Sequence, residues 1–421
     1  MSRPIRVLVV GAGPAGLLAA GSAARMGASV RLVERNSGPG AKLLITGKGR
    51  CNISNTASVK EFVQAFAPDG RFLYRAFSRF FREDLIEVLQ DNGVQVKVER
   101  GGRLFPAGDK AADVLAALLS WTKRAGVELR TGSRCTGLLI RESALAGIKI
   151  TGGTIEADRV ILATGGASYP RTGSTGDGYG LAASVGHTVA VPMPSLVPLV
   201  AQERFVRDLE GISLRNVRAT AILNGHASAS EAGEMVFTAD GLSGPIILTL
   251  SRLVVPHLAA GESVVISIDL KPAIPEQELE QRLIREMVGR LTMKSYLRTL
   301  LPARLVPVFL MLCKLDADKI ISHVSAEERR GLMHLLKDLR FVISSARPLD
   351  EAIVTAGGIP TKEIDPLTME SRLLPGLYFA GEIIDIDGPT GGYNLQAAFS
   401  TGWLAGVSAA MDKVQSLKTE V

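Results

Sequence analysis

The chain has 421 residues, of which 46% are hydrophobic and 21% are charged. These proportions are close to those of ordinary globular proteins, so the chain can bury a substantial core and is long enough for two or three domains. The formal net charge of +6 is modest for this length, and acidic residues are interspersed among the lysines and arginines. Composition therefore argues against disorder, and charge alone permits a polyanionic partner without indicating one.

An uncharged stretch from Val7 to Ala24 has the length of a signal peptide or short membrane span, but three glycines and a proline interrupt its centre. A spanning helix needs continuous apolar side chains there, so we interpret the stretch as a strand, a tight turn and a helix, and expect no membrane association. The cysteines, Cys51, Cys135 and Cys313, lie far apart, which predicts neither a disulfide framework nor a metal site. A cytoplasmic location is the resulting expectation.

The N-terminal segment predicts the start of a β-α-β unit in a parallel sheet. A strand is expected over 5–10, a helix over 16–26 and a second strand over 29–34. The turn between the first two reads Gly-Ala-Gly-Pro-Ala-Gly over 11–16. Since it follows a strand and opens a helix, it is a dinucleotide-binding fingerprint in its proper context.

Each glycine of this turn has a mechanical task. Gly11 permits the tight turn, Gly13 lets the backbone approach a pyrophosphate, and Gly16 lets the helix pack on the sheet. The free amides and the dipole at the start of the helix face the anion. Glu34 ends the second strand about 20 residues downstream, where it is placed to accept hydrogen bonds from an adenosine ribose.

The segment over 42–55 is too polar and rich in glycine to be a strand. We expect a loop whose backbone amides wrap a cofactor while Lys42 and Arg50 offset its negative charge.

One helix, expected over 71–92, carries a stripe of arginines interleaved with aromatic residues. On a helix of ~3.6 residues per turn these arginines occupy an arc of about 80°. Such a stripe can follow a phosphate backbone, but an ordinary solvated helix face also explains it, and we favour that explanation. The arginines are Arg71, Arg75, Arg79 and Arg82.

Several further elements are expected before the C-terminal part. The proline-broken region from 191 onward reads as antiparallel strands and then helices, which indicates a domain boundary. In chain order the elements are helices over 59–64 and 111–125, a small sheet over 94–99, 128–134, 138–141 and 147–150, a core strand over 159–163, antiparallel runs over 216–223, 234–238 and 263–270, helices within 275–336, and a strand over 340–344.

The C-terminal segment again reads as a strand, here ending at Gly381, a glycine loop over 387–392 and a helix from about 393. A second helix N-terminus suits a long cofactor, because the N1 and C2 carbonyl end of a flavin gains negative charge on reduction. NAD alone would leave this second site unexplained, so the predicted cofactor is FAD. An ordinary strand, turn and helix connection is the alternative.

Because both ends of the chain carry the nucleotide-binding pattern, the middle is interpreted as an insertion. The predicted domains are a discontinuous FAD-binding domain, 1–190 and 345–421, and an inserted domain, 191–344, made of an antiparallel β-rich part, 191–272, and a mainly helical part, 273–344.

Three stretches, 41–55, 352–360 and 378–396, together resemble the BaiN/RdsA family of NAD(P)/FAD-dependent oxidoreductases, also called YhiN-like or aminoacetone-oxidase-like flavoproteins. The resemblance covers nearly the whole chain, including 233–245. It implies an α/β fold, with a glutathione-reductase-type, Rossmann-like FAD domain and an inserted β-barrel-like and helical domain. One departure is Lys48, where glycine is more usual.

The same resemblance implies which residues contact FAD. They lie on the first glycine turn, the end of the second strand, the 42–52 loop, the strand that meets adenine, the 164–166 turn and the C-terminal loop. They are Gly11, Gly13, Pro14, Ala15, Gly16, Glu34, Arg35, Lys42, Leu43, Gly49, Arg50, Cys51, Asn52, Cys135, Thr164, Gly165, Gly166, Gly381, Glu382, Asp387, Gly391, Gly392, Asn394, Leu395 and Gln396.

Members of this family share hydride transfer through flavin N5, while the protein orients the substrate and moves the proton. The resemblance implies a reductase of an activated C=C bond, acting on a small molecule or on uridine in ribosomal RNA. NAD(P)H would be a transient donor, since no second fingerprint marks a nicotinamide domain. The alternatives are an oxidase of small amines and a non-catalytic flavin-holding RNA-binding protein.

Cys51 is the thiol expected near the flavin ring. The flanking Lys48 and Arg50 would favour its thiolate, and a thiol can deliver the proton that completes double-bond reduction. A packing role is the alternative. The lack of a Cys-x-x-Cys motif argues against a disulfide reductase.

Overall fold

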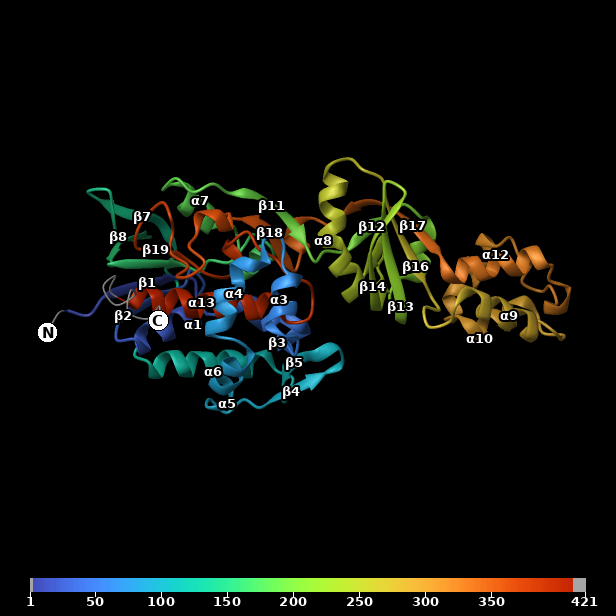
Figure 1. Ribbon diagram of the computed structural model, residues 1–421, viewed down its shortest axis with the longest axis horizontal. Helices are drawn as coiled ribbons and strands as arrows, with labels where there is room; N and C mark the ends of the chain where they lie inside the picture. The colour runs from blue at the N-terminus through green and yellow to red at the C-terminus, as the bar shows by residue number, and fades with distance from the viewer. Residues whose placement is uncertain (1–2, 412–421) are drawn as a thin grey trace. The chain divides into compact units, whose positions relative to one another are not determined.

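A computed structural model describes residues 3–411 of the chain (Figure 1). The chain folds as two compact units. Within the described residues, the first unit comprises 3–193 and 349–411, and the second comprises Pro194–Pro348. The sequence pattern placed both boundaries a few residues earlier, and positions 1–2 and 412–421 of its FAD-binding domain lie outside the described residues.

The first unit is built on a parallel sheet of five strands in the order β19-β10-β1-β2-β6. Three of its strands, β19, β10 and β1, are nearly continuous apolar runs, as expected for a parallel sheet that is covered on both faces, whereas the edge strand β6 is exposed. β19 follows β10 by more than two hundred positions in sequence, yet pairs with it, so the two ends of the chain share one sheet. The strands are β1 (Arg6–Val10), β2 (Ser29–Val33), β6 (Glu128–Arg130), β10 (Arg159–Leu162) and β19 (Leu377–Phe379).

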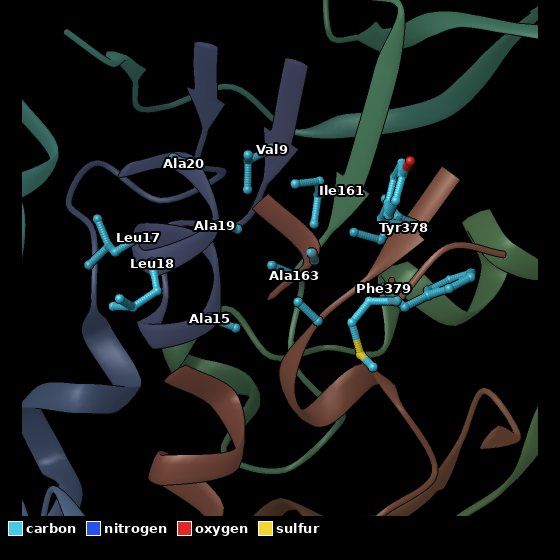
Figure 2. Close-up of a cluster of buried hydrophobic side chains, with 14 of the residues drawn as sticks. Val9, Ala15, Leu17, Leu18, Ala19, Ala20, Ile161, Ala163, Tyr378 and Phe379 are labelled. Carbon is cyan, nitrogen blue, oxygen red and sulfur yellow. The ribbon is translucent and has the colours of Figure 1, made fainter. Parts of the chain in front are cut away.

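Two helices from opposite ends of the chain, α1 (Pro14–Arg25) and α13 (Tyr393–Ala410), pack directly on each other. Small residues make this possible: a Cβ atom on Gly402 would lie 2.2 Å from the backbone oxygen of Ala15. Figure 2 shows side chains of α1, including Ala19, gathered with Val9 of β1 and Phe379 of β19 in one buried cluster. This core holds the first glycine turn and the C-terminal segment in one body.

The expected helix over 71–92 is wrong as a single element. It is a short 3-10 turn over Gly70–Leu73, then α4 (Tyr74–Arg79), then α5 (Arg82–Gln90). Phe80 and Phe81 between the helices are extended, because Phe81 packs edge-on against Phe62 and its amide is capped by the Asp84 carboxylate at 2.7 Å. Arg82 therefore lies on a different helix from the other arginines of the stripe.

The other elements of the first unit form small layers around the main sheet. The expected small sheet is in fact divided: β4 joins β5 and β3, β6 extends the main sheet, and β7, β8 and β9 form a separate antiparallel sheet. The remaining elements are α2 (Ala41–Ile45), β3 (Ser54–Asn55), α3 (Val59–Ala65), β4 (Val96–Glu99), β5 (Arg103–Pro106), α6 (Ala111–Arg124), β7 (Cys135–Arg141), β8 (Ala144–Ile150), β9 (Gly153–Glu156), α7 (Asp177–Ala183), β11 (Ala190–Ser195) and its partner β18 (Val354–Gly358).

The second unit contains a closed six-stranded barrel in the order β12-β15-β14-β13-β16-β17, with four helices between β16 and β17. One helix that the sequence pattern missed, α8 (Pro245–Ala259), packs on β14; its continuous apolar run does not distinguish a strand from a buried helix. The others are β12 (Leu199–Ala201), β13 (Ser213–Leu223), β14 (His226–Phe237), β15 (Gly241–Ser243), β16 (Val264–Asp269), α9 (Glu276–Glu286), α10 (Met293–Leu300), α11 (Val306–Leu312), α12 (Ala326–Lys337) and β17 (Leu339–Ala346).

Across residues 3–411, none of the helices combines the length and the apolar character that crossing a bilayer requires.

The close approach of α1 and α13 gives a stability test. Gly402→Ala places a methyl group against the Ala15 carbonyl, so we expect a loss of roughly 1–3 kcal/mol and a lower melting temperature, measured by thermal unfolding. Gly180→Ala in α7 is the matched control, because its Cβ would meet no atom within 4 Å. It should be neutral or stabilise by up to ~1 kcal/mol. Equal melting temperatures for the two variants would contradict this account of the helix contact.

Candidate functional site

The first glycine turn leaves space around one of its three glycines, Gly13. A Cβ on Gly11 would lie 2.4 Å from the Ala163 oxygen, and one on Gly16 would lie 1.8 Å from the Gly11 oxygen. A Cβ on Gly13, by contrast, would meet no protein atom within 4 Å. Gly11 and Gly16 are therefore required by the protein itself, whereas Gly13 keeps space free above the start of α1.

This opening lies at a helix N-terminus that is suited to an anion. Gly13 is the N-cap of α1 and provides no side-chain cap, Pro14 occupies the first turn, and that turn contains no acidic residue. The amides of the first turn have no partner within the helix, and the helix dipole adds partial positive charge there. Open space, free amides and the dipole together fit the pyrophosphate of a dinucleotide.

Glu34 has a structural task that the sequence pattern did not predict. Its buried carboxylate accepts hydrogen bonds from the amides of Ala12 and Asn36, both at 2.8 Å. It therefore ties the end of β2 to the glycine turn. Each carboxylate oxygen has a further lone pair, so the predicted ribose contact is compatible with these bonds.

Arg35 and Cys135 are the two residues predicted to lie near the adenine end of FAD. Arg35 is ion-paired within the protein, and Cys135 is buried. Arg35 donates to Asp177 at 3.1 Å, and Arg134 donates to the same carboxylate at 2.8 Å. Cys135 is buried, and burial raises the pKa of its thiol to about 11. The predicted contacts of Arg35 and Cys135 with the cofactor stay predictions.

The 42–55 segment is not a plain loop: it begins with α2 and continues as a 3-10 turn over Thr46–Gly49. Lys42, on α2, donates to the Glu382 carboxylate at 2.7 Å and to the Ser168 hydroxyl at 2.8 Å. Glu382 also accepts the amide of Thr355 at 2.9 Å. Four segments distant in sequence thus meet at one carboxylate, and Lys42 is engaged there.

Arg50 is also engaged by the protein. Its guanidinium forms ion pairs with Glu99 and Asp109 and lies over the ring of Phe105, 4.2 Å from the ring centroid. These carboxylates raise the pKa of Arg50, and the pKa values of Glu99 and Asp109 are lowered in return. Arg50 therefore fastens the segment to β4 and β5, and its predicted role in offsetting the negative charge of a cofactor stays a prediction.

The same segment reaches the C-terminal glycine loop. Asn55 donates to the Gly391 oxygen at 3.0 Å, and Asn52, with its amide oriented to satisfy both ends, accepts the Gly392 amide at 3.0 Å. Gly392 has φ 99°, and a Cβ there would lie 2.2 Å from the Ser54 oxygen. Contact between these two segments therefore requires glycine at 392.

Two polar side chains in the first turn of α13 are engaged by the protein itself. Asn394 accepts the Gly388 amide and donates to the Gly388 oxygen, both at 2.8 Å. The fully buried Gln396 accepts from Ser54 at 2.7 Å and donates to Ser400 at 3.0 Å. α13 has Gly392 as its N-cap, no side-chain cap and no acidic residue in its first turn, so no protein carboxylate offsets the positive end of its dipole.

Several other predicted contacts are placed in the same part of the first unit. The Thr164 hydroxyl is buried without a partner and faces α7, since a Cβ on Gly178 would lie 2.0 Å from it. Any contact of Thr164 with a cofactor must therefore come from its backbone. The remaining predicted FAD contacts lie on the segments described above. They are Leu43, Gly49, Gly165, Gly166, Gly381, Asp387 and Leu395.

The expectation of a Cys51 thiolate is wrong. The side chain is fully buried, and burial raises the pKa of the thiol to about 12. Arg50 is committed to its carboxylates and Lys48 is exposed, so neither cation offsets the cost of desolvating the thiolate. The proton-donor role of Cys51 stays a prediction, for a neutral thiol.

The structure also differs from the predicted stripe of arginines over 71–82. Arg82 donates to the backbone oxygens of Asn55 at 2.8 Å and Ala57 at 3.0 Å, so it supports the end of the 42–55 segment. The Nε atom of Arg75 is buried without a partner, while Arg71 and Arg79 are exposed. The four arginines therefore do not form one stripe along a single helix.

One acid that the sequence pattern missed is Asp385. It is partly buried between Glu382 and the glycine loop, and it accepts the Gly357 amide at 3.1 Å. Burial, together with the nearby charge of Asp387, raises the pKa of this carboxyl. A group that holds its proton beyond the usual range of aspartate is suited to general acid chemistry. Nothing in its local sequence distinguishes it from a solvated loop aspartate.

The family model described as "HI0933-like protein Rossmann domain" matches residues 5–408. The chain belongs to this family. The predicted family and fold class are thereby confirmed, and the protein is an FAD-dependent oxidoreductase.

Relatives of the HI0933-like family match over nearly their full length. The chain is 33% identical over 409 residues to the 3-dehydro-bile acid delta(4,6)-reductase of Clostridium scindens, covering 96% of this chain and 99% of that one. It is 30% identical over 414 residues to the ribosomal RNA dihydrouridine synthase of Haemophilus influenzae, covering 97% and 99%. The corresponding Escherichia coli protein is 28% identical over 396 residues, covering 94% and 96%.

Among solved structures, the fold is similar to that of the 3-ketosteroid-delta4-(5alpha)-dehydrogenase from Rhodococcus jostii RHA1. The TM-score is 0.52, the sequences are 17% identical, and 98% of each chain is covered. This likeness concerns the fold.

The opening above Gly13 gives a direct test of the cofactor site. Gly13→Val should fold, because no protein atom lies within 4 Å of the new Cβ, but should lose FAD, because the side chain occupies the space of the pyrophosphate. The measurement is the flavin absorbance per protein together with the circular dichroism spectrum. Gly16→Val is the contrasting variant, expected to fail in folding. A folded, fully yellow Gly13→Val protein would place the pyrophosphate elsewhere.

Proposed function

We propose that the protein is an NAD(P)H-dependent reductase of an activated C=C bond and that its substrate is uridine in ribosomal RNA, which it converts to dihydrouridine. The observation that carries this proposal is the match to two ribosomal RNA dihydrouridine synthases across at least 94% of this chain. A delta(4,6)-reductase and a dihydrouridine synthase share one chemistry, the addition of hydrogen across a C=C bond.

The residues of the site fit FAD. The amides at the start of α1 would hold the pyrophosphate, Glu34 the ribose, and the amides at the start of α13 the N1 and C2 carbonyl end of the ring. When bound, FAD supplies hydride transfer to the substrate. The protein contributes orientation and proton delivery.

NAD(P)H is proposed as a transient electron donor. The sequence contains one dinucleotide fingerprint, which the proposed FAD site uses, so a separate nicotinamide domain is not expected. The nicotinamide would then bind transiently next to the flavin and dissociate before the RNA binds. The three cysteines are free thiols, two buried and one partly buried, which suits a cytoplasmic enzyme.

Asp385 is the proton donor that we favour over Cys51. Saturating a C=C bond requires one proton at the carbon that does not receive hydride. Asp385 is partly exposed, and its raised pKa lets it hold that proton at higher pH than an ordinary aspartate. The Cys51 thiol is sealed from solvent, so it would have no route for regaining a proton after each turnover.

A second candidate substrate is a small conjugated compound such as a steroid-like enone. The relative that favours it is the bile acid reductase, at 33% identity. An oxidase of small amines remains the third alternative, and peroxide release on addition of aminoacetone would identify it.

The function test uses ribosomal RNA from a strain that lacks the gene. Mass spectrometry should find one uridine site that has lost the two added hydrogen atoms, and the purified holoprotein with NADPH should restore them. Free 3-oxo bile acids with conjugated double bonds serve as the small-molecule arm. Unchanged ribosomal RNA together with NADPH-dependent reduction of the small enone would replace RNA by the second candidate.

The proton-donor assignment predicts a split between half-reactions. Asp385→Asn keeps an acceptor for the Gly357 amide, so flavin bleaching by NADPH should continue, while uridine reduction should fall by roughly 10²–10⁴-fold. In the parent enzyme the rate should fall as pH rises through the raised pKa of Asp385, and this limb should vanish in the variant. A larger loss in Cys51→Ala than in Asp385→Asn would identify the thiol as the donor instead.

A further inference from the structure

Three cations lie on the short segment that begins with α2, and only one of them is available to a ligand. Lys42 is bound to Glu382 and Ser168, and Arg50 is bound to Glu99 and Asp109. Lys48 is exposed, and its side chain makes no hydrogen bond or ion pair with any residue in 3–411. The charge of Lys48 is therefore not used by the fold.

The backbone at Lys48 favours glycine rather than lysine. Its φ and ψ are 59° and 42°, in the left-handed region, between Gly47 at φ 56° and Gly49 at φ 83°. A Cβ is strained in this conformation, so glycine would serve the turn better. A lysine that costs the fold and makes no contact within it is a candidate for contact with a ligand.

The surroundings of Lys48 suit one kind of ligand. Leu44 and Ile45, at the end of α2, are 38% and 45% exposed, so apolar surface precedes the cation in the chain. Asn52 and Asn55 of the same segment bind Gly392 and Gly391, at the helix N-terminus that fits the flavin ring. Apolar surface and an unpaired cation, on a segment that also contacts the loop of the proposed ring site, match a nucleotide, which combines a flat base with a phosphate.

We propose that Lys48 binds a backbone phosphate of the RNA strand next to the uridine that is reduced. This inference rests on the proposed function and assigns to it a substrate-binding residue. Lysine acts there as a point charge, so the contact holds the strand without reading its sequence. Binding at this position is expected to release one condensed counterion.

Lys314 provides a matched control within the same chain. It is also exposed and left-handed, with φ 53°, but it directly follows the C-cap of α11. A left-handed residue and a cation are both ordinary at a helix C-terminus. Lys314→Gly therefore removes the same charge and the same strain as Lys48→Gly, at a position with an ordinary structural explanation.

The test measures binding of a fluorescein-labelled oligouridylate to the holoproteins over a series of KCl concentrations. Lys48→Gly should weaken binding and reduce the slope of log Kd against log salt by about 0.7, the value for one phosphate on a single strand. Lys48→Arg should retain the slope. Lys314→Gly should behave as the parent, and flavin content should be equal in all four proteins. An unchanged slope in Lys48→Gly overturns the inference.

The salt dependence of RNA binding and the formation of dihydrouridine are separate measurements, so the Lys48 contact and the proposed function can be contradicted independently. If the parent forms dihydrouridine and Lys48→Gly keeps the parental slope, the phosphate contact is wrong and the function stands. If the slope depends on Lys48 but no uridine is reduced, the contact stands and the reaction is wrong. If the parent neither binds oligouridylate nor modifies ribosomal RNA, both are wrong.

Discussion

The carboxylate of Glu382 connects parts of the first unit that are far apart in sequence. It accepts hydrogen bonds from Lys42 on α2, from Ser168 after the 164–166 turn and from the Thr355 amide on β18. The Lys42 and Glu382 side chains are only 19% and 20% exposed, so either charge left without its partner would be costly. The Glu382 carboxylate therefore couples the positions of these segments around the proposed cofactor site.

Side chains and backbone amides of this site therefore have different roles. The polar side chains of the site are largely occupied by the protein: Arg50 by two carboxylates, Asn394 by its own loop, and Gln396 by Ser54 and Ser400. We therefore propose that a dinucleotide is bound mainly at the N-termini of α1 and α13, where no side chain caps the helix. Backbone amides at a helix N-terminus are fixed in direction by the helix, so they bind negative charge without loss of side-chain freedom. Substrate choice is then left to groups outside this framework, which agrees with one fold serving relatives that act on a bile acid and on ribosomal RNA.

Burial separates the two groups considered for proton transfer. Both pKa values are raised by burial, but Cys51 is enclosed completely whereas Asp385 retains an exposed part. A raised pKa keeps either acid protonated, and only access to solvent allows the proton to be replaced. The distinction depends on depth in the fold, which residue type and spacing do not report.

The sequence by itself determined the features governed by local geometry. The roles of Gly11, Gly13 and Gly16 follow from the strand, turn and helix around them, and the space found at each position agrees. The tertiary structure alone decided the partners of Arg50, Glu382 and Gln396, the break at Phe80 and Phe81, and the burial of Cys51. Each of these depends on contacts with residues distant in the chain, and a side chain's hydrogen bonds and solvation are set by whichever neighbours the fold brings to it.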